Sequence, residues 1–156
     1  MAIIDVSFII PVYNRPEEIN ELLSSFNNLD GNYDFEIVII EDGSDNCSDN
    51  IISNYSNDLN ISYYTKKNTG PGHSRNFGMK RAKGNYFIIL DSDCILPNNY
   101  LLNFFTNINN KYVDCFGGVD DSHYSFTNFQ KAVNFTMTSL ITTAGVRAVS
   151  YTHLRA

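Results

Sequence analysis

One stretch of the sequence constrains the fold more than any other: the apolar run at residues 86–90, which stops on Asp91, Ser92 and Asp93. A run of this length, rich in aromatic and β-branched residues and entered through Gly84, is typical of a strand buried on both faces of a sheet. In an open parallel sheet the carboxyl ends of the strands border the ligand crevice. We therefore expect Asp91 and Asp93 to lie at a ligand site, where both carboxylates can turn toward one point.

An Asp-x-Asp by itself is also what a strand followed by an acidic turn looks like, so the neighbouring segments decide its meaning. Residues 6–10 and 35–40 predict two more apolar strands, and each of them runs into a polar loop, at residues 11–14 and 41–45. Residues 60–65 predict a weaker strand, which we expect at a sheet edge.

Helices are expected between these strands. Pro16 with Glu17 and Glu18 starts the first, and apolar residues then recur at helical spacing up to Phe26. Two further helices are predicted around residues 51–55 and 73–82. Strands that alternate with helices indicate right-handed crossovers, so the fold class is a Rossmann-type α/β fold with a mainly parallel sheet and helices on both faces.

Three more elements are predicted after this part of the chain. They are a helix around residues 100–105, a strand at residues 112–116 and an amphipathic helix from Phe126 to about Ile141.

Composition excludes several classes of protein. The chain has 156 residues and a net charge of −6, which argues against a general nucleic-acid binder because such a protein needs a basic face. No apolar run has the length of a membrane-spanning helix, and no signal peptide is visible. The thiols of Cys47, Cys94 and Cys115 have neither metal-ligand nor disulfide spacing, so we expect a reduced, cytoplasmic setting.

The three polar loops together suit a nucleoside diphosphate and a divalent cation. Asp42 can accept a hydrogen bond from the ring N–H of a uracil-like base, and Tyr13 can stack on that base. Asp91 can hold ribose hydroxyls, and Asp93 can hold a hard cation whose other ligands are diphosphate oxygens and water. Arg75, near a helix start, can donate to phosphate.

Each of these residues also has a purely structural interpretation. Asp42 would then be part of a turn and helix cap, Tyr13 part of the core, and Arg75 a solvated helix charge. His73 and His123 are isolated histidines of the kind found at surfaces and turns. What favours a functional site is that all three loops occur in one chain and in a consistent order.

At this point the sequence resembles the family 2 glycosyltransferases, inverting enzymes of the GT-A fold. The resemblance covers residues 5–148 and rests on four motifs, at residues 7–14, 41–45, 68–78 and 90–93. Residues 117–120 and 137–147 also look like a subset of bacterial members of the family. The four motifs together are highly specific, whereas the Asp-x-Asp alone is weak.

The resemblance implies a nucleotide-sugar donor, with a UDP-sugar favoured, and Mg²⁺ or Mn²⁺ as cofactor. By position, Asp42 looks like the acid that binds the base, Asp93 like the metal ligand, and Asp91 like its neighbour on ribose or metal. The nucleotide site would also include Pro11, Tyr13 and Arg75. The acceptor would be a glycan or a lipid-linked sugar in bacterial polysaccharide or glycoconjugate synthesis, at a cytoplasmic location or at the inner face of the membrane.

The sequence departs from the family pattern in two ways. Glu41 stands where an Asp is common, and the family's catalytic base lies well downstream, beyond Ala156. We therefore expect residues 1–148 to be an incomplete nucleotide-sugar-binding domain that transfers little or no sugar, and residues 149–156 to be a non-native tail. The predicted helix from Phe126 to Ile141 would then be loosely packed, or buried by self-association through exposed apolar surface.

Three other interpretations stay open at this stage. The chain can be a nucleotide-sugar binder without catalytic activity. It can be a phosphatase of the haloacid-dehalogenase type with Asp91 as nucleophile, although that motif normally lies on the first strand of its domain. A dinucleotide-binding loop at residues 70–75 is the weakest interpretation, because Arg75 replaces the third glycine.

Overall fold

The computed structural model describes residues 5–117 together with residues 127 and 128. The chain divides into two compact units, Met1–Thr106 and Asn107–Ala156. All the strands in the described residues belong to the first unit. The predicted helix from Phe126 to Ile141, the acids Asp120 and Asp121 and the predicted tail at 149–156 lie outside the described residues.

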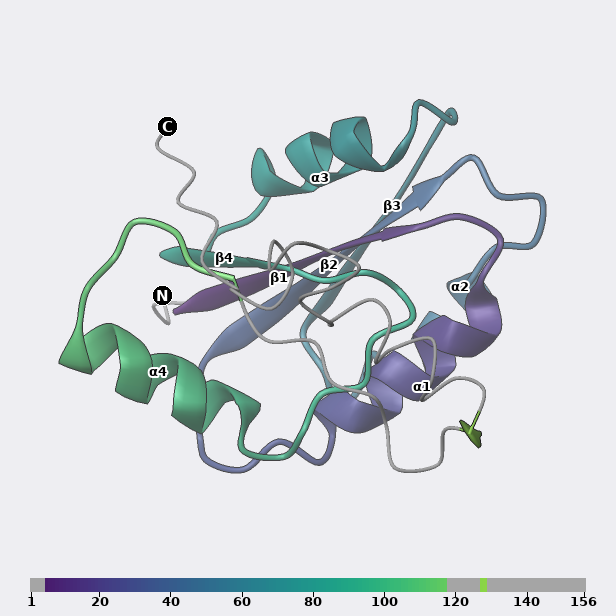
Figure 1. Cartoon of the computed structure of the whole chain (residues 1–156). Helices are drawn as coiled ribbons and strands as arrows, with labels where there is room; N and C mark the ends of the chain where they lie inside the picture. The colour runs from purple at the N-terminus through teal and green to yellow at the C-terminus, as the bar shows by residue number, and fades with distance from the viewer. Residues whose placement is uncertain (1–4, 118–126, 129–156) are drawn as a thin grey trace. The chain divides into compact units, whose positions relative to one another are not determined.

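The first unit is built on a parallel sheet of four strands (Figure 1). The strands are β1 (Val6–Val12), β2 (Phe35–Asp42), β3 (Ile61–Lys66) and β4 (Tyr86–Ile89), in the order β3-β2-β1-β4. The central position of β1 means that the loops after β2 and β4 flank the loop after β1. The predicted parallel α/β fold, with the strand at residues 60–65 at a sheet edge, is confirmed.

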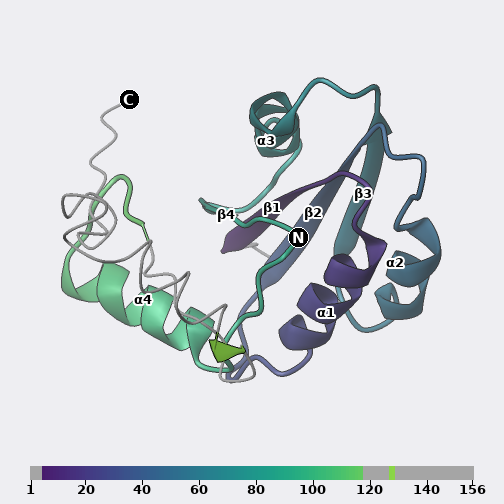
Figure 2. The ribbon, with the colours of Figure 1, turned by 45° about the vertical axis from the view of Figure 1, so that its right-hand side comes forward.

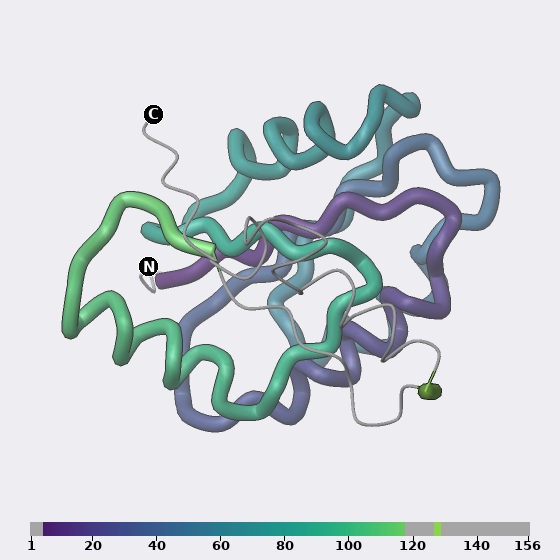
Figure 3. The backbone as a smooth tube through the Cα atoms, viewed as in Figure 1, coloured from purple at the N-terminus to yellow at the C-terminus, as the bar shows by residue number. Residues whose placement is uncertain are grey.

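The helices lie on both faces of this sheet, as the turned view in Figure 2 shows. They are α1 (Pro16–Phe26), α2 (Asp49–Tyr55), α3 (Pro71–Met79) and α4 (Tyr100–Asn110). The backbone trace in Figure 3 follows each of the first three strands into the helix that precedes the next strand. Each of these crossovers brings the chain back to the amino end of the sheet, so every strand delivers its following loop to the opposite, carboxyl edge.

The core has a layer on each face of the sheet. The larger layer contains alternate residues of β1 and β2, such as Phe8 and Ile37, with the buried stripe of α1. The smaller layer contains Ile9, Val38 and Ile40 and is covered by α3. Every residue of β1 is buried. Both faces of the two central strands are covered, so their middle residues are apolar, and the polar residues Ser7, Glu36, Glu41 and Asp42 lie buried near the strand ends.

Gly78 explains how closely α3 lies on the sheet. A methyl group added at this glycine would approach Ile40 Cδ1 to 2.6 Å and Ile9 Cγ2 to 2.7 Å. A larger residue would have to push the helix away from the strands. The position of α3, and of the loop that leads into it, thus depends on this glycine.

The expectation that residues 86–90 are buried on both faces is wrong. Ile88 is buried in the larger core layer, but Phe87 and Ile89 are each 46% exposed. The reason is that β4 pairs with β1 alone among the described strands, while α3 packs on β1 and β2. An apolar run does not distinguish a central strand from an edge strand of a parallel sheet.

Two other local predictions need correction. Residues 112–116 form no strand, and Tyr112 is 67% exposed, because no strand in the described part of the chain pairs with this segment. Pro11 does not end β1, which continues to Val12. The strand tolerates this proline because its pairing with β4 stops at Ile9, so no ladder hydrogen bond to β4 is lost there.

Among the described residues, no helix has both the length and the apolar character that crossing a membrane requires.

Candidate functional site

A hollow of about 340 Å³ lies at the carboxyl ends of β1, β2 and β4. Its lining comprises Pro11, Val12, Tyr13, Arg15, Asp42, Pro71, Asp91, Ser92 and Asp93. All of the predicted site residues except Arg75 are in this set. The structure therefore brings together three loops that are far apart in the sequence, as the rule for parallel sheets predicts.

Tyr13 is half exposed at the rim of the hollow, so the alternative that it belongs to the core is wrong. Pro11, by contrast, is buried within β1 and contributes to the wall. An exposed aromatic ring beside a hollow is available to stack on a planar ligand group.

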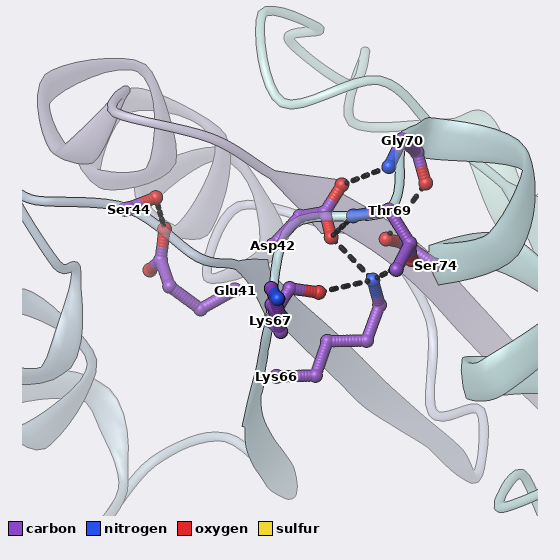
Figure 4. Close-up of polar contacts among 8 residues, drawn as sticks. All are labelled: Glu41, Asp42, Ser44, Lys66, Lys67, Thr69, Gly70 and Ser74. Atoms are coloured by element: carbon purple, nitrogen blue, oxygen red, sulfur yellow. Dashed lines mark hydrogen bonds and ion pairs between the residues drawn. The ribbon is translucent and has the colours of Figure 1, made fainter.

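Asp42 is the most completely bonded acid of the site (Figure 4). Its Oδ1 accepts a hydrogen bond from the amide of Thr69 at 2.9 Å and forms an ion pair with Nζ of Lys66. Its Oδ2 accepts from the amide of Gly70 at 2.8 Å. The side chain of Asp42 is only 5% exposed, so these partners replace most of its contact with water. Asp42 is thus the anchor of the loop between β3 and α3 as well as part of the hollow.

The environment of Asp42 keeps its carboxylate charged. Burial alone would raise the pKa of this group, but the hydrogen bond and positive charge of Lys66, with the amides of Thr69 and Gly70, outweigh burial. The pKa of Asp42 therefore lies below its ordinary value. An ionised carboxylate only accepts hydrogen bonds, so any group that binds to it must be a donor.

Glu41 points away from this corner and organises the loop after β2. It is buried, and it accepts hydrogen bonds from the hydroxyl of Ser44, from the amide of Ser48 at 3.0 Å and from the hydroxyl of Tyr63 at 3.0 Å. Burial, together with the charge and hydrogen bond of Glu41, raises the pKa of Tyr63. The hydrogen bonds of Glu41 thus come from the loop after β2 and from Tyr63 of β3.

Asn14 joins the loop after β1 to the loop after β2, a role that the sequence analysis did not assign. Its side-chain Oδ1 accepts hydrogen bonds from the backbone amides of Asp45 at 2.8 Å and Asn46 at 3.0 Å. The backbone amide of Asn14 donates to Ser44 Oγ at 2.8 Å. Its φ of 53° lies in the left-handed region, which Asn adopts more readily than most residues. The tendency of Asn to adopt a left-handed φ was the sequence signal that could have pointed to this role of Asn14.

The two acids of the Asp-x-Asp are each paired with a different arginine. Arg75 Nη2 lies 2.6 Å from Asp91 Oδ1, and Arg15 Nη1 lies 3.4 Å from Asp93 Oδ2. Arg15 also reaches Glu18 at 3.3 Å. Both acids are well exposed to solvent, and both line the hollow. Arg15 cannot be identified as a site residue from the sequence, because only the pairing of β1 with β4 brings it beside Asp93.

Arg75 lies beside the first hollow and reaches it through Asp91. It lines a second hollow of about 420 Å³ with Gly72, His73, Asn76, Met79 and Ile89. Its Nε atom is buried and has no hydrogen-bond partner in the described residues. The alternative that Arg75 is only a solvated helix charge is therefore wrong, since its guanidinium holds an acid of the site.

Asp91 and Asp93 are the side chains available to hold the predicted Mg²⁺ or Mn²⁺. Among the described residues, no three His, Cys, Asp or Glu side chains gather as a metal site. Asp91 and Asp93 supply hard oxygen donors at the same hollow. This set fits Mg²⁺ or Mn²⁺ only when substrate phosphates and water complete the coordination, which is how proteins usually hold Mg²⁺.

A comparison with protein families identifies the chain. The family model described as glycosyl transferase family 2 matches residues 7–153. The chain belongs to this family. The match includes residues 149–153, and the suggestion that residues 149–156 are a non-native tail stays a prediction.

Curated glycosyltransferases align with the chain. An uncharacterised glycosyltransferase of Rickettsia bellii is 41% identical over 97 residues, which are 62% of this chain and 14% of that protein. The poly(ribitol-phosphate) beta-N-acetylglucosaminyltransferase TarS of Staphylococcus aureus is 37% identical over 90 residues, which are 56% of this chain and 16% of TarS. The chain thus spans a small part of the length of these relatives.

Solved structures share the fold of this chain. The crystal structure of TarS residues 1–349 with UDP-GlcNAc superposes with a TM-score of 0.67 and 29% identity, over 80% of this chain and 39% of that one. A mannosyltransferase from Pyrobaculum calidifontis, in complex with GDP-Man and Mn²⁺, superposes with a TM-score of 0.64 and 22% identity, over 75% of this chain and 35% of that one. The first unit therefore has the GT-A fold that the sequence predicted.

Proposed function

We propose that this chain forms the donor-binding part of a glycosyltransferase that moves a sugar from a nucleoside diphosphate to an acceptor hydroxyl. The observation that carries the proposal is the hollow itself, where Tyr13, Asp42, Asp91 and Asp93 line one site from the carboxyl ends of three strands. The aromatic ring of Tyr13 suits stacking on a base, and the charged acceptor Asp42 suits the ring N–H of that base. The acids Asp91 and Asp93 suit the ribose and a metal-bound diphosphate.

A uridine diphosphate is the donor group that these side chains favour. Asp42 is held as an ionised acceptor at the wall of the hollow, so it suits a base with a ring N–H. TarS, which shares this fold, is a solved relative that holds UDP-GlcNAc.

Asp93, with Asp91 beside it, would hold Mg²⁺ or Mn²⁺ together with diphosphate oxygens. Such an ion neutralises negative charge on a departing diphosphate. Arg75 and Arg15 lie next to these acids and carry fork-shaped donors that match phosphate oxygens. When the diphosphate and its metal are bound, the arginines can exchange an acid partner for a phosphate partner.

No catalytic base is assigned among the described residues. Asp42 is bonded to Lys66, Thr69 and Gly70, and the two acids of the Asp-x-Asp are assigned to the donor. Inverting transfer needs a base within hydrogen-bond reach of the acceptor hydroxyl. We also propose that the acceptor is a glycan or a lipid-linked sugar and that the protein acts in the cytoplasm or at the inner face of the membrane.

Calorimetry with UDP in the presence of Mn²⁺ tests the proposal. The wild-type chain should bind UDP, and a chelator should weaken the binding. Asp93→Ala should lose this metal effect, whereas Asp58→Ala, which removes an exposed acid away from the hollow, should keep it. Equal UDP affinity with and without metal in the wild type would overturn the metal assignment.

A transfer assay with a labelled UDP-sugar separates an enzyme from a binder. Release of UDP or labelling of an acceptor supports the enzyme. Binding of UDP without either outcome means that this chain by itself binds the nucleotide sugar without turning it over, as expected for a donor-binding part that lacks the catalytic base.

A further inference from the structure

Lys66 directs every donor of its ammonium group into the protein (Figure 4). Its Nζ bonds to Asp42 Oδ1, to the hydroxyl of Thr69 at 2.6 Å and to the carbonyl of Lys67 at 3.2 Å. An ammonium group has three N–H donors, so these partners use all of them. The side chain is 13% exposed, and it does not line the hollow. Lys66 can therefore act on a ligand only through its bonded partners, and of these Asp42 is the one that lines the hollow.

The hydrogen bonds of Asp42 leave one acceptor position open. A carboxylate oxygen can accept about two hydrogen bonds. Oδ1 already accepts from Lys66 and from the amide of Thr69, whereas Oδ2 accepts from the amide of Gly70 alone within the described residues. Since Asp42 lines the hollow, the remaining position on Oδ2 is the one that a ligand can use.

The loop that makes these bonds is packed against the strand end that carries Asp42. Gly43 has φ +73°, and a methyl group added there would lie 2.6 Å from the backbone nitrogen of Asn68. At the other end of the loop, Ser74 Oγ donates to the carbonyl of Gly70 at 3.1 Å. The loop is thus held on both sides, so the acceptor position on Asp42 is preorganised rather than formed by the ligand.

We propose that Lys66 is a positioning residue for base selection: it occupies Oδ1 of Asp42, holds the group as a charged acceptor and leaves Oδ2 to read a ring N–H. This inference rests on the proposed function. The site would then select uracil, whose ring nitrogen carries hydrogen, over cytosine, whose corresponding ring nitrogen is an acceptor. With cytosine bound, Oδ2 of Asp42 would face the acceptor nitrogen of the ring, and both groups would lack a hydrogen-bond partner. This loss disfavours the binding of cytosine strongly.

Removal of Lys66 should relax this selection. Without its charge, burial favours the neutral form of Asp42, and a protonated carboxyl can donate to cytosine as well as accept. The other charged groups that line the hollow with Asp42 are Arg15, Asp91 and Asp93. These three residues act equally on any nucleoside diphosphate, so the ratio of UDP to CDP affinity isolates the base.

The experiment measures UDP and CDP affinities of the full chain with Mn²⁺ between about pH 8 and about pH 5.5, a range in which an ordinary Asp stays charged. In the wild type the UDP preference should stay constant across this range. In Lys66→Met the preference should fall about tenfold at the acid end, as expected for loss of a hydrogen bond to a charged group. Lys66→Arg, which keeps the charge, should retain the preference, and so should Lys67→Met, the exposed neighbour.

The outcomes separate the possible failures. If Lys66→Met binds UDP and CDP more weakly by the same factor at every pH, Lys66 only stabilises the loop and the inference is overturned. If the wild type binds neither nucleotide, the proposed function fails with it. A thermal melt of each variant shows whether it is folded. If the Met variant is not folded, Lys66→Gln, which keeps a hydrogen-bond donor but removes the charge, decides the question by the same ratio of UDP to CDP affinity.

Discussion

Arg15 and Asp93 form an ion pair across 78 positions of sequence, with 3.4 Å between Nη1 and Oδ2. Arg15 follows β1 and Asp93 follows β4, and the parallel pairing of these strands places the two loops side by side. Arg75 holds Asp91 in a similar way at 2.6 Å. A divalent cation that binds these acids must therefore compete with two guanidinium groups, unless a diphosphate engages the arginines at the same time.

Arg15→Gln should consequently have opposite effects on the cation and on the nucleotide. Affinity for Mn²⁺ alone should rise a few-fold, because an exposed ion pair that competes with the metal is worth about 0.2–1 kcal/mol. Affinity for UDP in the presence of Mn²⁺ should fall, because one phosphate donor is lost. Calorimetry of the two titrations checks both signs, with Arg81→Gln as a control on an arginine that does not line the hollow. A fall in both affinities would contradict the competition.

Asp42→Ala should weaken UDP binding by about 1–3 kcal/mol, the range for loss of a hydrogen bond to a charged group. The same substitution frees the amides of Thr69 and Gly70, so part of the loss comes from a looser loop. Asp42→Asn, which keeps acceptor capacity, should retain more of the loop than Ala does. Unchanged UDP affinity in both variants would mean that Asp42 serves only the loop.

The contribution of Asp42 to the free energy of unfolding should decrease at low pH. The pKa of Asp42 in the folded chain lies below the unfolded value of 3.8, so the charged group stabilises the fold above that value. The contribution is lost as the pH falls through the folded-state pKa. The free energy of unfolding of wild type minus that of Asp42→Asn should therefore be about 1–3 kcal/mol near neutral pH and should shrink toward zero in strong acid. Urea titrations of both proteins measure this difference, and a difference that is constant with pH would argue against it.

Glu36→Ala should destabilise the chain without affecting the nucleotide. Glu36 is buried at the amino end of the sheet, where its Oε1 accepts from Ser7 Oγ at 2.6 Å and from the amide of Lys83. Alanine leaves these buried donors unsatisfied, so we expect a loss of about 2–4 kcal/mol in the free energy of unfolding. UDP affinity of the folded variant should equal that of wild type, because Glu36 is at the sheet end opposite to the hollow. A thermal melt and a calorimetric titration check the two statements.

The pattern of the sequence was sufficient for the fold class and for most members of the site. Apolar runs that end in polar loops predicted the strands at residues 6–10 and 35–40, and the rule for parallel sheets then predicted that Asp42, Asp91 and Asp93 share one edge. These inferences succeed because strand period and crossover direction are local properties of the chain.

The partners of each acid were decided by tertiary structure. Nothing near Asp42 in the sequence indicates that Lys66 and Gly70 hold it, and nothing near Asp93 indicates Arg15. The exposure of Phe87 likewise depends on which strands α3 covers. Contacts of this kind depend on the register of strands far apart in the chain, whereas the sequence pattern records only which residues prefer a strand, a helix or a turn. The sequence therefore determined the fold and the edge where the site lies, and the packing of distant segments determined how each side chain is charged, paired and presented there.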